Sequence, residues 1–209
     1  MPRIILSIGG GHVTGIRETV SYIKVALSEA FVNTQISVVD LDQLLEEKPR
    51  SFSDKDYDFE QIYQQLSSQQ DTDQWEAVLL CGAYALFNDK INQLSQLKVF
   101  LDSDGDKRLI DLIHRRNATT PEKLTVCIDE YMDHLRPEMQ KFIEPTKSRA
   151  DLIIPSSSGS VGSAIIVDSI VKIVQDNKGG SSQTRKLFPH LDFQAERLDI
   201  EKEKYYDLS

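Results

Sequence analysis

Scarce cysteine and a shortage of basic charge limit what this chain of 209 residues can do. Its two cysteines, Cys81 and Cys127, are too few for a disulfide scaffold and lack the spacing of a metal site, so we predict two reduced, buried thiols. Lysine and arginine total 24 against 33 acidic residues, for a net charge of −9. The sequence therefore predicts no nucleic-acid partner and no membrane-surface partner.

Long hydrophobic runs are also lacking. The first apolar stretch, residues 4–8, is too short for the core of a signal peptide, and no continuous apolar run reaches 18 residues. These absences predict an intracellular protein of the cytoplasm, with the nucleus as an alternative that the sequence does not separate. A 40% hydrophobic content suits one domain with a sizeable core.

What the chain does contain is an alternation of buried strands and amphipathic helices. Short β-branched or apolar runs predict strands at residues 3–8, 35–39, 77–81, 96–101 and 151–155. Apolar residues at a spacing near 3.6 predict helices at 14–31, 59–66, 108–116, 123–142 and 164–175. Strands that alternate with helices indicate an α/β fold with a parallel, doubly wound sheet.

The glycine-rich stretch after the first strand has the outline of a phosphate-binding loop but not its chemistry. A working loop, GxxxxGK[ST], cradles phosphates with backbone N–H groups, a lysine and a metal-binding hydroxyl. Gly10 and Gly15 keep the glycine spacing here, whereas Ile16 stands in place of the lysine and Arg17 in place of the hydroxyl. Gly9–Gly11 at a helix N-terminus can still bind an anion weakly through backbone N–H groups alone.

The last 32 residues differ in composition from the rest. We predict a domain over residues 1–177 and, over 178–209, a linker followed by a C-terminal tail. The tail carries aromatic and aliphatic residues among charges, and we expect it to dock on the domain, because exposed aromatic residues are usually covered. A partner-binding motif is the alternative.

Isolated polar residues also have ordinary structural interpretations. Asp40 and Asp42 follow a strand, where α/β folds place ligands, but a helix cap or a solvated strand end is the default. His12 is interpreted as a solvated loop residue and Arg17 as a surface residue. The run DSDGD at 102–106 resembles a calcium loop but has no glutamate at position 113 to complete it, so we predict no metal site.

Two later segments, VFLDSDGDKRL and LRPEMQKFIEPTKSRADLIIP, resemble the uridine–cytidine kinase family. The resemblance covers residues 4–176 and is strongest in the C-terminal half. It implies a P-loop NTPase-like three-layer αβα fold with a five-stranded parallel sheet flanked by helices. It also implies ATP and Mg²⁺ as cofactors, and transfer of the γ-phosphoryl group to the 5′-hydroxyl of uridine or cytidine in pyrimidine salvage.

Carried over residue by residue, the resemblance departs at the catalytic chemistry. The family's loop lysine falls on Ile16, its hydroxyl on Arg17 and its strand-end acid on Cys81. Of the lid arginines, Arg115 is retained, with Arg116 beside it. The segment that contacts the base is shortened to SSQQDTDQ.

At other positions, the side chains suit the roles in nucleoside binding that the resemblance assigns to them. Asp42 falls on the acid that orients the nucleoside hydroxyl and takes its proton. The resemblance implies nucleoside contacts for Tyr57, Asp58 and Tyr63. The degenerate phosphate loop would comprise the residues Gly10, Gly11, His12, Gly15, Ile16 and Arg17.

Two functions remain open at this point. The first is a pseudokinase that keeps the fold as a binding or regulatory scaffold, as a homo-oligomer or with an active relative; we favour it because several catalytic groups are replaced together. The alternative is an active, divergent uridine–cytidine kinase that uses Asp42 as its base. The expected ligand is a nucleotide or a pyrimidine nucleoside.

Overall fold

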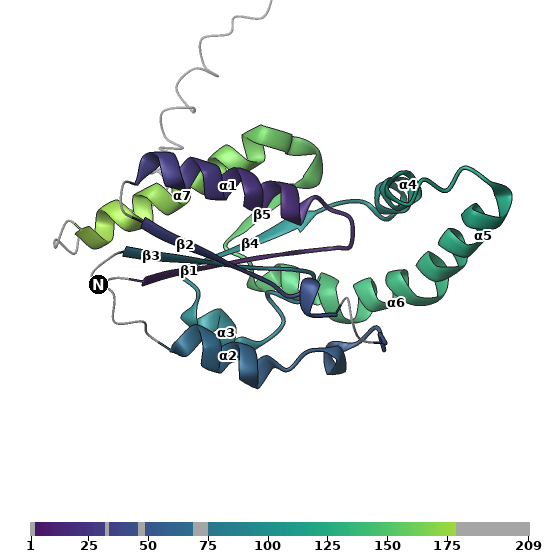
Figure 1. Cartoon of the computed structure of the whole chain (residues 1–209), viewed down its shortest axis with the longest axis horizontal. Coiled ribbons are helices and arrows are strands. Elements are labelled where there is room, and N and C mark those ends of the chain that lie inside the picture. Colours follow the sequence, from purple (N-terminus) through teal and green to yellow (C-terminus); the bar gives the residue numbers. More distant parts are fainter. Residues whose placement is uncertain (1–2, 32–33, 46–48, 69–74, 179–209) are drawn as a thin grey trace, which may run out of the picture.

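The computed structural model describes residues 3–31, 34–45, 49–68 and 75–178 (Figure 1). The predicted tail, and most of the SSQQDTDQ segment, lie outside these residues. The linker and tail predictions therefore stay untested.

The predicted parallel sheet is confirmed. Its five strands are β1 (Arg3–Gly10), β2 (Thr34–Asp40), β3 (Trp75–Cys81), β4 (Leu97–Asp102) and β5 (Leu152–Pro155). Their order is β2-β3-β1-β4-β5, and every neighbouring pair is parallel. The carboxyl ends of all five strands consequently lie along one edge, which is where open α/β sheets bind ligands.

Helices cover both faces of the sheet, as the three-layer prediction requires. The seven α-helices of the described chain are α1 (Ile16–Ala30), α2 (Phe59–Ser67), α3 (Asp89–Leu94), α4 (Gly105–Arg115), α5 (Pro121–Glu130), α6 (Arg136–Glu138) and α7 (Gly159–Lys178). In Figure 1, α1 and α7 lie on one face and α2 and α3 on the other, while α4 and α5 extend beyond the edge of the sheet. The sequence analysis missed α3, a short helix whose start is capped by the Asn88 side chain.

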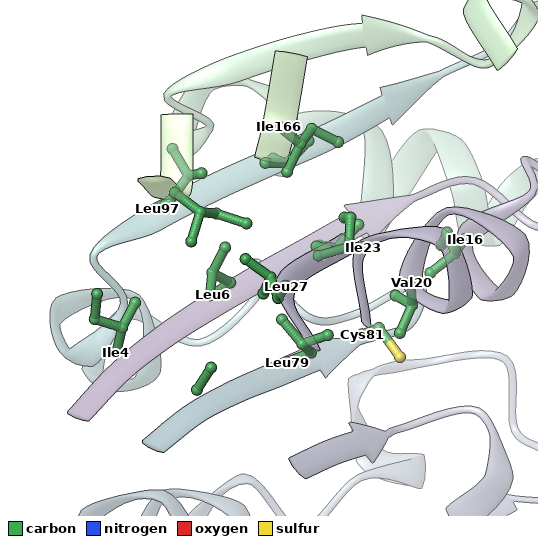
Figure 2. Packing of buried hydrophobic residues seen from close by; sticks show 14 of the residues in the cluster. Ile4, Leu6, Ile16, Val20, Ile23, Leu27, Leu79, Cys81, Leu97 and Ile166 are labelled. Carbon is green, nitrogen blue, oxygen red and sulfur yellow. The ribbon is translucent and has the colours of Figure 1, made fainter. Parts of the chain in front are cut away.

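The alternation of side chains along β1 divides the core in two. Ile4, Leu6 and Ile8 face the cluster formed with α1 and α7, part of which is shown in Figure 2. Ile5 faces the other cluster, to which α2 and α3 contribute. Both faces of the central strand are therefore buried, which explains its nearly continuous hydrophobic sequence.

The long helix predicted over residues 123–142 is interrupted. Beyond α5 the chain forms a π-helical turn at Tyr131–Leu135, the short α6, and a second π-helical turn at Met139–Ile143. Pro137 lies between the two turns, and a proline inside a helix removes one backbone donor and crowds the preceding turn. The widened turns accommodate this proline without ending the helical path.

One segment of the described chain, Ser156–Asp176, is by length and composition apolar enough to cross a membrane. Serine and glycine interrupt the apolar residues of this segment, so it contains no long continuous apolar run. In the fold α7 packs against α1, and Ile166, Ile170 and Val174 are buried in the shared cluster. One face of the helix is therefore buried against α1, and the rest of it, including Val161 and Ile165, is exposed.

Neighbouring residues of α7 provide a direct test of this packing. Ile166 is fully buried, whereas Ile165 is 46% exposed. We expect Ile166→Ala to lower the free energy of unfolding by about 2–5 kcal/mol, because it removes buried methyl groups and leaves a cavity. Ile165→Ala should stay within about 0.5 kcal/mol of the unmodified chain. Urea unfolding followed by circular dichroism measures both, and equal effects would contradict the burial of this face.

Candidate functional site

The glycine loop is shaped by close backbone packing at the end of β1. A Cβ atom on Gly10 would lie 2.7 Å from the carbonyl oxygen of Leu101, which is too close for any side chain. The Thr14 hydroxyl donates to the Gly11 carbonyl at 2.8 Å and closes the turn. Gly15 adopts φ 79° immediately before α1. Strand, glycine turn and helix therefore follow one another as in a phosphate-binding loop.

Val13, in the middle of this loop, has an unusual backbone conformation. Its φ of 62° lies in the left-handed region, which β-branched residues rarely adopt. Its side chain packs against a small cluster whose buried members include Leu112 and Tyr131. Contacts with α4 and the helix that follows thus hold the loop in a conformation that costs energy.

The two substituted loop positions take up structural roles. Ile16 is 8% exposed and belongs to the core cluster, at the same end as Val20 and Cys81 in Figure 2. Arg17 forms an ion pair with Asp40, with 2.8 Å between Nε and Oδ2. Arg17 is exposed, as the sequence interpretation expects, and its ion pair also links α1 to the end of β2.

A cavity of about 450 Å³ opens beside the loop. The glycine loop and the start of α1 form one wall, and the ends of α4 and α5 form another. Asp42, Arg50 and Arg115 reach it from three different segments. Most residues predicted for the phosphate loop line this cavity together with Asp42 and Arg115: Gly11, His12, Gly15, Ile16 and Arg17.

Asp42 lies at this cavity with few solvent contacts. Its carboxylate accepts a hydrogen bond from the Ala83 backbone N–H at 3.3 Å. Burial raises the pKa of Asp42, and the nearby charges of His12 and Arg50 partly oppose that rise. A carboxyl group whose pKa is raised and which lies at a cavity is a candidate for proton transfer.

His12 is not the solvated loop residue that the sequence suggested. Its Nε2 lies 2.8 Å from Oε2 of Glu138, whose side chain is fully buried. Arg50 donates to both carboxylate oxygens of Glu138, at 2.9 and 3.1 Å. The Tyr84 hydroxyl adds a bond of 3.1 Å. One buried carboxylate therefore ties the glycine loop to Arg50 and to the turn after β3.

The residues predicted to contact a nucleoside lie apart from this cavity. Tyr57 and Asp58 border another hollow, of about 530 Å³, which shares Leu45 with the first. Asp58 caps α2 by accepting from the Gln61 N–H. Tyr63 is half-buried against the second core cluster and lines neither hollow.

The Tyr57 hydroxyl is buried and has no hydrogen-bond partner among the described residues. Burial, with the nearby carboxylate of Asp42, raises the pKa of Tyr57. A buried, unpaired hydroxyl beside a hollow is a group that a ligand can satisfy.

Cys81 lies at the end of β3, at the position to which the resemblance assigns an acid, and it is chemically inert there. It is 1% exposed, and burial, with the nearby acids Asp40 and Asp42, raises the pKa of its thiol to about 12. A thiol is no metal ligand until it is deprotonated. The free thiols predicted for Cys81 and Cys127 are confirmed, and both are buried.

The first acid of the run 102–106 is engaged in an ion pair. Asp102 pairs with Lys147 at 2.6 Å, which joins the end of β4 to the segment before β5. Within the described ranges, no group of three or more histidine, cysteine, aspartate or glutamate side chains is arranged to hold a metal ion.

The serine-rich segment after β5 borders a further cavity of about 320 Å³ against α1. Ser156, Ser160 and Ser163 line it, with Thr14 of the glycine loop and Tyr22 of α1. The segment thus lies beside the glycine loop.

Sequence reasoning missed Arg50, Tyr84 and Glu138. Each is unremarkable in its local pattern, and Glu138 lies 126 residues from His12. Only the helical spacing from Tyr131 to Glu138 hinted that Glu138 faces inward.

Comparison with known proteins identifies relatives of this chain. The Phosphoribulokinase / Uridine kinase family matches residues 44–161, more than half of the chain. A Saccharomyces cerevisiae protein named "Putative uridine kinase DAS2" is 45% identical, over 99% of this chain and 96% of its own length. A protein of Lactococcus lactis named uridine kinase is 28% identical, over 83% of this chain and 98% of its own length.

Solved structures agree on the fold. Phosphoribulokinase from Rhodobacter spheroides superposes with a TM-score of 0.52 at 13% identity, covering 73% of this chain and 70% of that one. At such low identity the likeness supports the αβα architecture alone.

The raised pKa of Asp42 gives a testable pH dependence. Because the folded state holds this proton more tightly than the unfolded state, ionising Asp42 costs stability as pH rises from the unfolded pKa to the folded pKa. Asp42→Asn should therefore raise Tm at pH 7, by about 2–4 °C for each kcal/mol of burial cost removed, and the gain should vanish below the unfolded pKa. Thermal melts from pH 3 to 8 measure this, with exposed Asp168→Asn as control. A Tm gain that is equal at all pH values would contradict it.

Proposed function

The chain belongs to the phosphoribulokinase/uridine kinase family, and we propose that it is a uridine kinase-like pseudokinase that binds a nucleoside or nucleotide without efficient phosphoryl transfer. The family fold and a cavity at the glycine loop support the binding function. The replacement of catalytic side chains supports the loss of transfer.

Ile16 carries this proposal. The position after Gly15 requires a cation that reaches the phosphates, yet the side chain here is apolar and packed into the core. Arg17, at the position of the metal-binding hydroxyl, is committed to Asp40 and brings positive charge to where a cation would have to bind. The replacement at Ile16 removes a cation that a transferring phosphoryl group needs, and the replacement at Arg17 removes the hydroxyl that would hold the metal ion.

The groups present do not fit ATP with Mg²⁺ in the family's manner. Ile16 and Cys81 offer neither a charge nor an accessible oxygen, and Arg17 repels a metal ion. We therefore derive no transfer step through these cofactors.

A second candidate function, a divergent active kinase, has one observation in its favour. Asp42 keeps the position of the acid and lies at the cavity, with its pKa raised toward the range useful for a base. Phosphoryl transfer by this route would need the charges at the phosphates to be supplied by the arginines of the cavity.

An activity measurement separates the two functions. We expect purified protein with MgATP and uridine or cytidine to form no monophosphate above an enzyme-free blank, because the loop cation is absent. Calorimetric titration with MgATP, alone and with uridine, should likewise show no tight binding. Formation of uridine monophosphate that is lost in Asp42→Asn would instead establish the active kinase.

Restoring the loop chemistry tests the reason for the loss. The double change Ile16→Lys with Arg17→Ser should tighten MgATP binding at least tenfold, about 1.4 kcal/mol, because it returns the lysine and the hydroxyl. Ile16→Met, which remains apolar, is the matched control and should change little. Unaltered MgATP affinity in the double variant, with its thermal melt intact, would show that these two positions do not limit binding.

A further inference from the structure

The outer face of α7 carries exposed apolar side chains. Val161 is 66% exposed and Ile165 is 46% exposed, and their spacing of four residues places them side by side. Ala164, between them on the same face, is exposed as well, and we call these three residues the apolar strip. None of them lines either cavity beside the glycine loop. Adjacent exposed apolar side chains of this kind mark an interaction surface.

Charged residues follow the apolar strip on the same face of α7. Asp168 lies three residues after Ile165, Lys172 lies four residues after Asp168, and both are exposed. Residues at such spacings share one face of a helix. Neither forms an ion pair with another described residue. From the end of the helix toward its start, this face therefore presents a base, an acid and then the apolar strip.

The sequence that follows α7 complements this face in the reverse direction. Residues 179–184 are GGSSQT, a composition typical of linkers. Two bases, Arg185 and Lys186, come next, and LFPHLDF at 187–193 follows with leucine and phenylalanine side chains. A chain that turns back along α7 brings these bases to Asp168 and the apolar side chains to the strip. The match to the yeast relative covers 99% of this chain and therefore extends into these residues.

The lengths allow this return. At about 1.5 Å per residue along the helix axis, Asp168 lies about 15 Å from the last residue of α7, and Val161 about 26 Å. An extended chain covers about 3.3 Å per residue, so Arg185 reaches about 23 Å from that point and Phe188 about 33 Å. Each residue therefore reaches its partner with little length to spare. The end of α7 also points away from α4 and α5 (Figure 1), so the outer face of α7 itself is the nearer surface.

A membrane or a second copy of the chain fits this face less well. The opposite face of α7, with Ile166, Ile170 and Val174, is fixed in the core, so only the strip is open to lipid. A net charge of −9 opposes approach to an anionic membrane surface. A segment attached to the end of α7 has an effective concentration in the millimolar range, which a separate copy does not reach at ordinary protein concentrations. The attached segment therefore occupies the strip first.

We propose that residues 185–193 dock along the outer face of α7, with their apolar side chains over Val161 and Ile165 and their two bases beside Asp168. The docked segment covers apolar surface that is otherwise open to a second copy or to lipid. Docking on this face goes beyond the proposed function, because it involves neither the glycine-loop cavity nor its ligand.

Thiol labelling of the full chain tests the docking. Val161→Cys places a reporter in the apolar strip, while both native cysteines are buried. The comparison variant also carries serine replacements at the apolar positions of the segment: Leu187→Ser, Phe188→Ser, Leu191→Ser and Phe193→Ser. We expect maleimide to modify the reporter about fivefold faster in this variant, because the segment no longer buries apolar surface on the strip.

Val25→Cys is the matched control, because Val25 is an exposed apolar residue on α1. Its rate should be the same with either tail. Equal rates for Val161→Cys with both tails overturn the proposal, and so does equal protection of Val25→Cys. Protection that appears only at high protein concentration, or only with phosphatidylcholine vesicles, assigns the strip to a second copy or to lipid and also overturns it. Ile165→Cys replaces the reporter if a thermal melt shows that Val161→Cys disturbs the fold.

Charge reversal tests the direction of docking. In the Val161→Cys chain, Asp168→Lys should raise the maleimide rate about twofold, a small effect because exposed ion pairs contribute little. Adding Arg185→Glu and Lys186→Glu to that variant should restore the slower rate. Glu29→Lys makes the same charge change at an exposed position of α1 and should leave the rate unaltered. A rate that the added changes do not restore shows that the bases do not lie beside Asp168, which overturns the proposed arrangement.

Discussion

The central position of β1 in the sheet controls the geometry of everything at the site. The strand pairs with β3 on one side and β4 on the other, so that Ile8 lies opposite Cys81 and Gly10 opposite Leu101. A strand held on both edges delivers its last residues to a fixed place, and the missing Cβ of Gly10 lets the backbone of β4 approach. The loop keeps its path because the sheet fixes it. The loop backbone therefore keeps its shape although Ile16 and Arg17 stand in place of the lysine and the hydroxyl, because these replacements alter only side chains.

Which parts of the fold and of the site could be predicted depends on how far apart in the sequence the interacting residues lie. Five strands and most helices were foreseen because hydrophobic periodicity is a local signal, and the loop outline was visible in its glycines. The break near Pro137 was missed because the pattern continues across the π-helical turns. His12 was misjudged because its partner, Glu138, lies far along the chain, and no local pattern reports such a contact.

The arm formed by α4 and α5 gives the loop a second support. Val13 packs against the cluster that contains Leu112 of α4 and Cys127 of α5. The hydroxyl of Tyr131, the residue that follows α5, donates to the Gly105 carbonyl at the start of α4 at 2.7 Å. The loop is therefore held by the sheet beneath it and by the arm beside it, and the cavity lies between these supports. The π-helical turns on either side of α6 belong to the same arrangement, since they carry the chain past Pro137 while Glu138 faces inward.

Carboxylates partner three of the four arginines that line the cavity, and this pairing limits the positive charge that the cavity offers to an anion. Arg17 pairs with Asp40, Arg50 with Glu138 and Arg116 with Glu130. A cation that is already paired offers an anion only part of its charge, because the resident carboxylate competes for the same donors. A triphosphate needs several unshared charges or a metal ion. Replacing the loop lysine with Ile16 removes a cation that reaches the phosphates from the loop itself. The positive charge that remains is shared with carboxylates, of which Glu138 is fully buried.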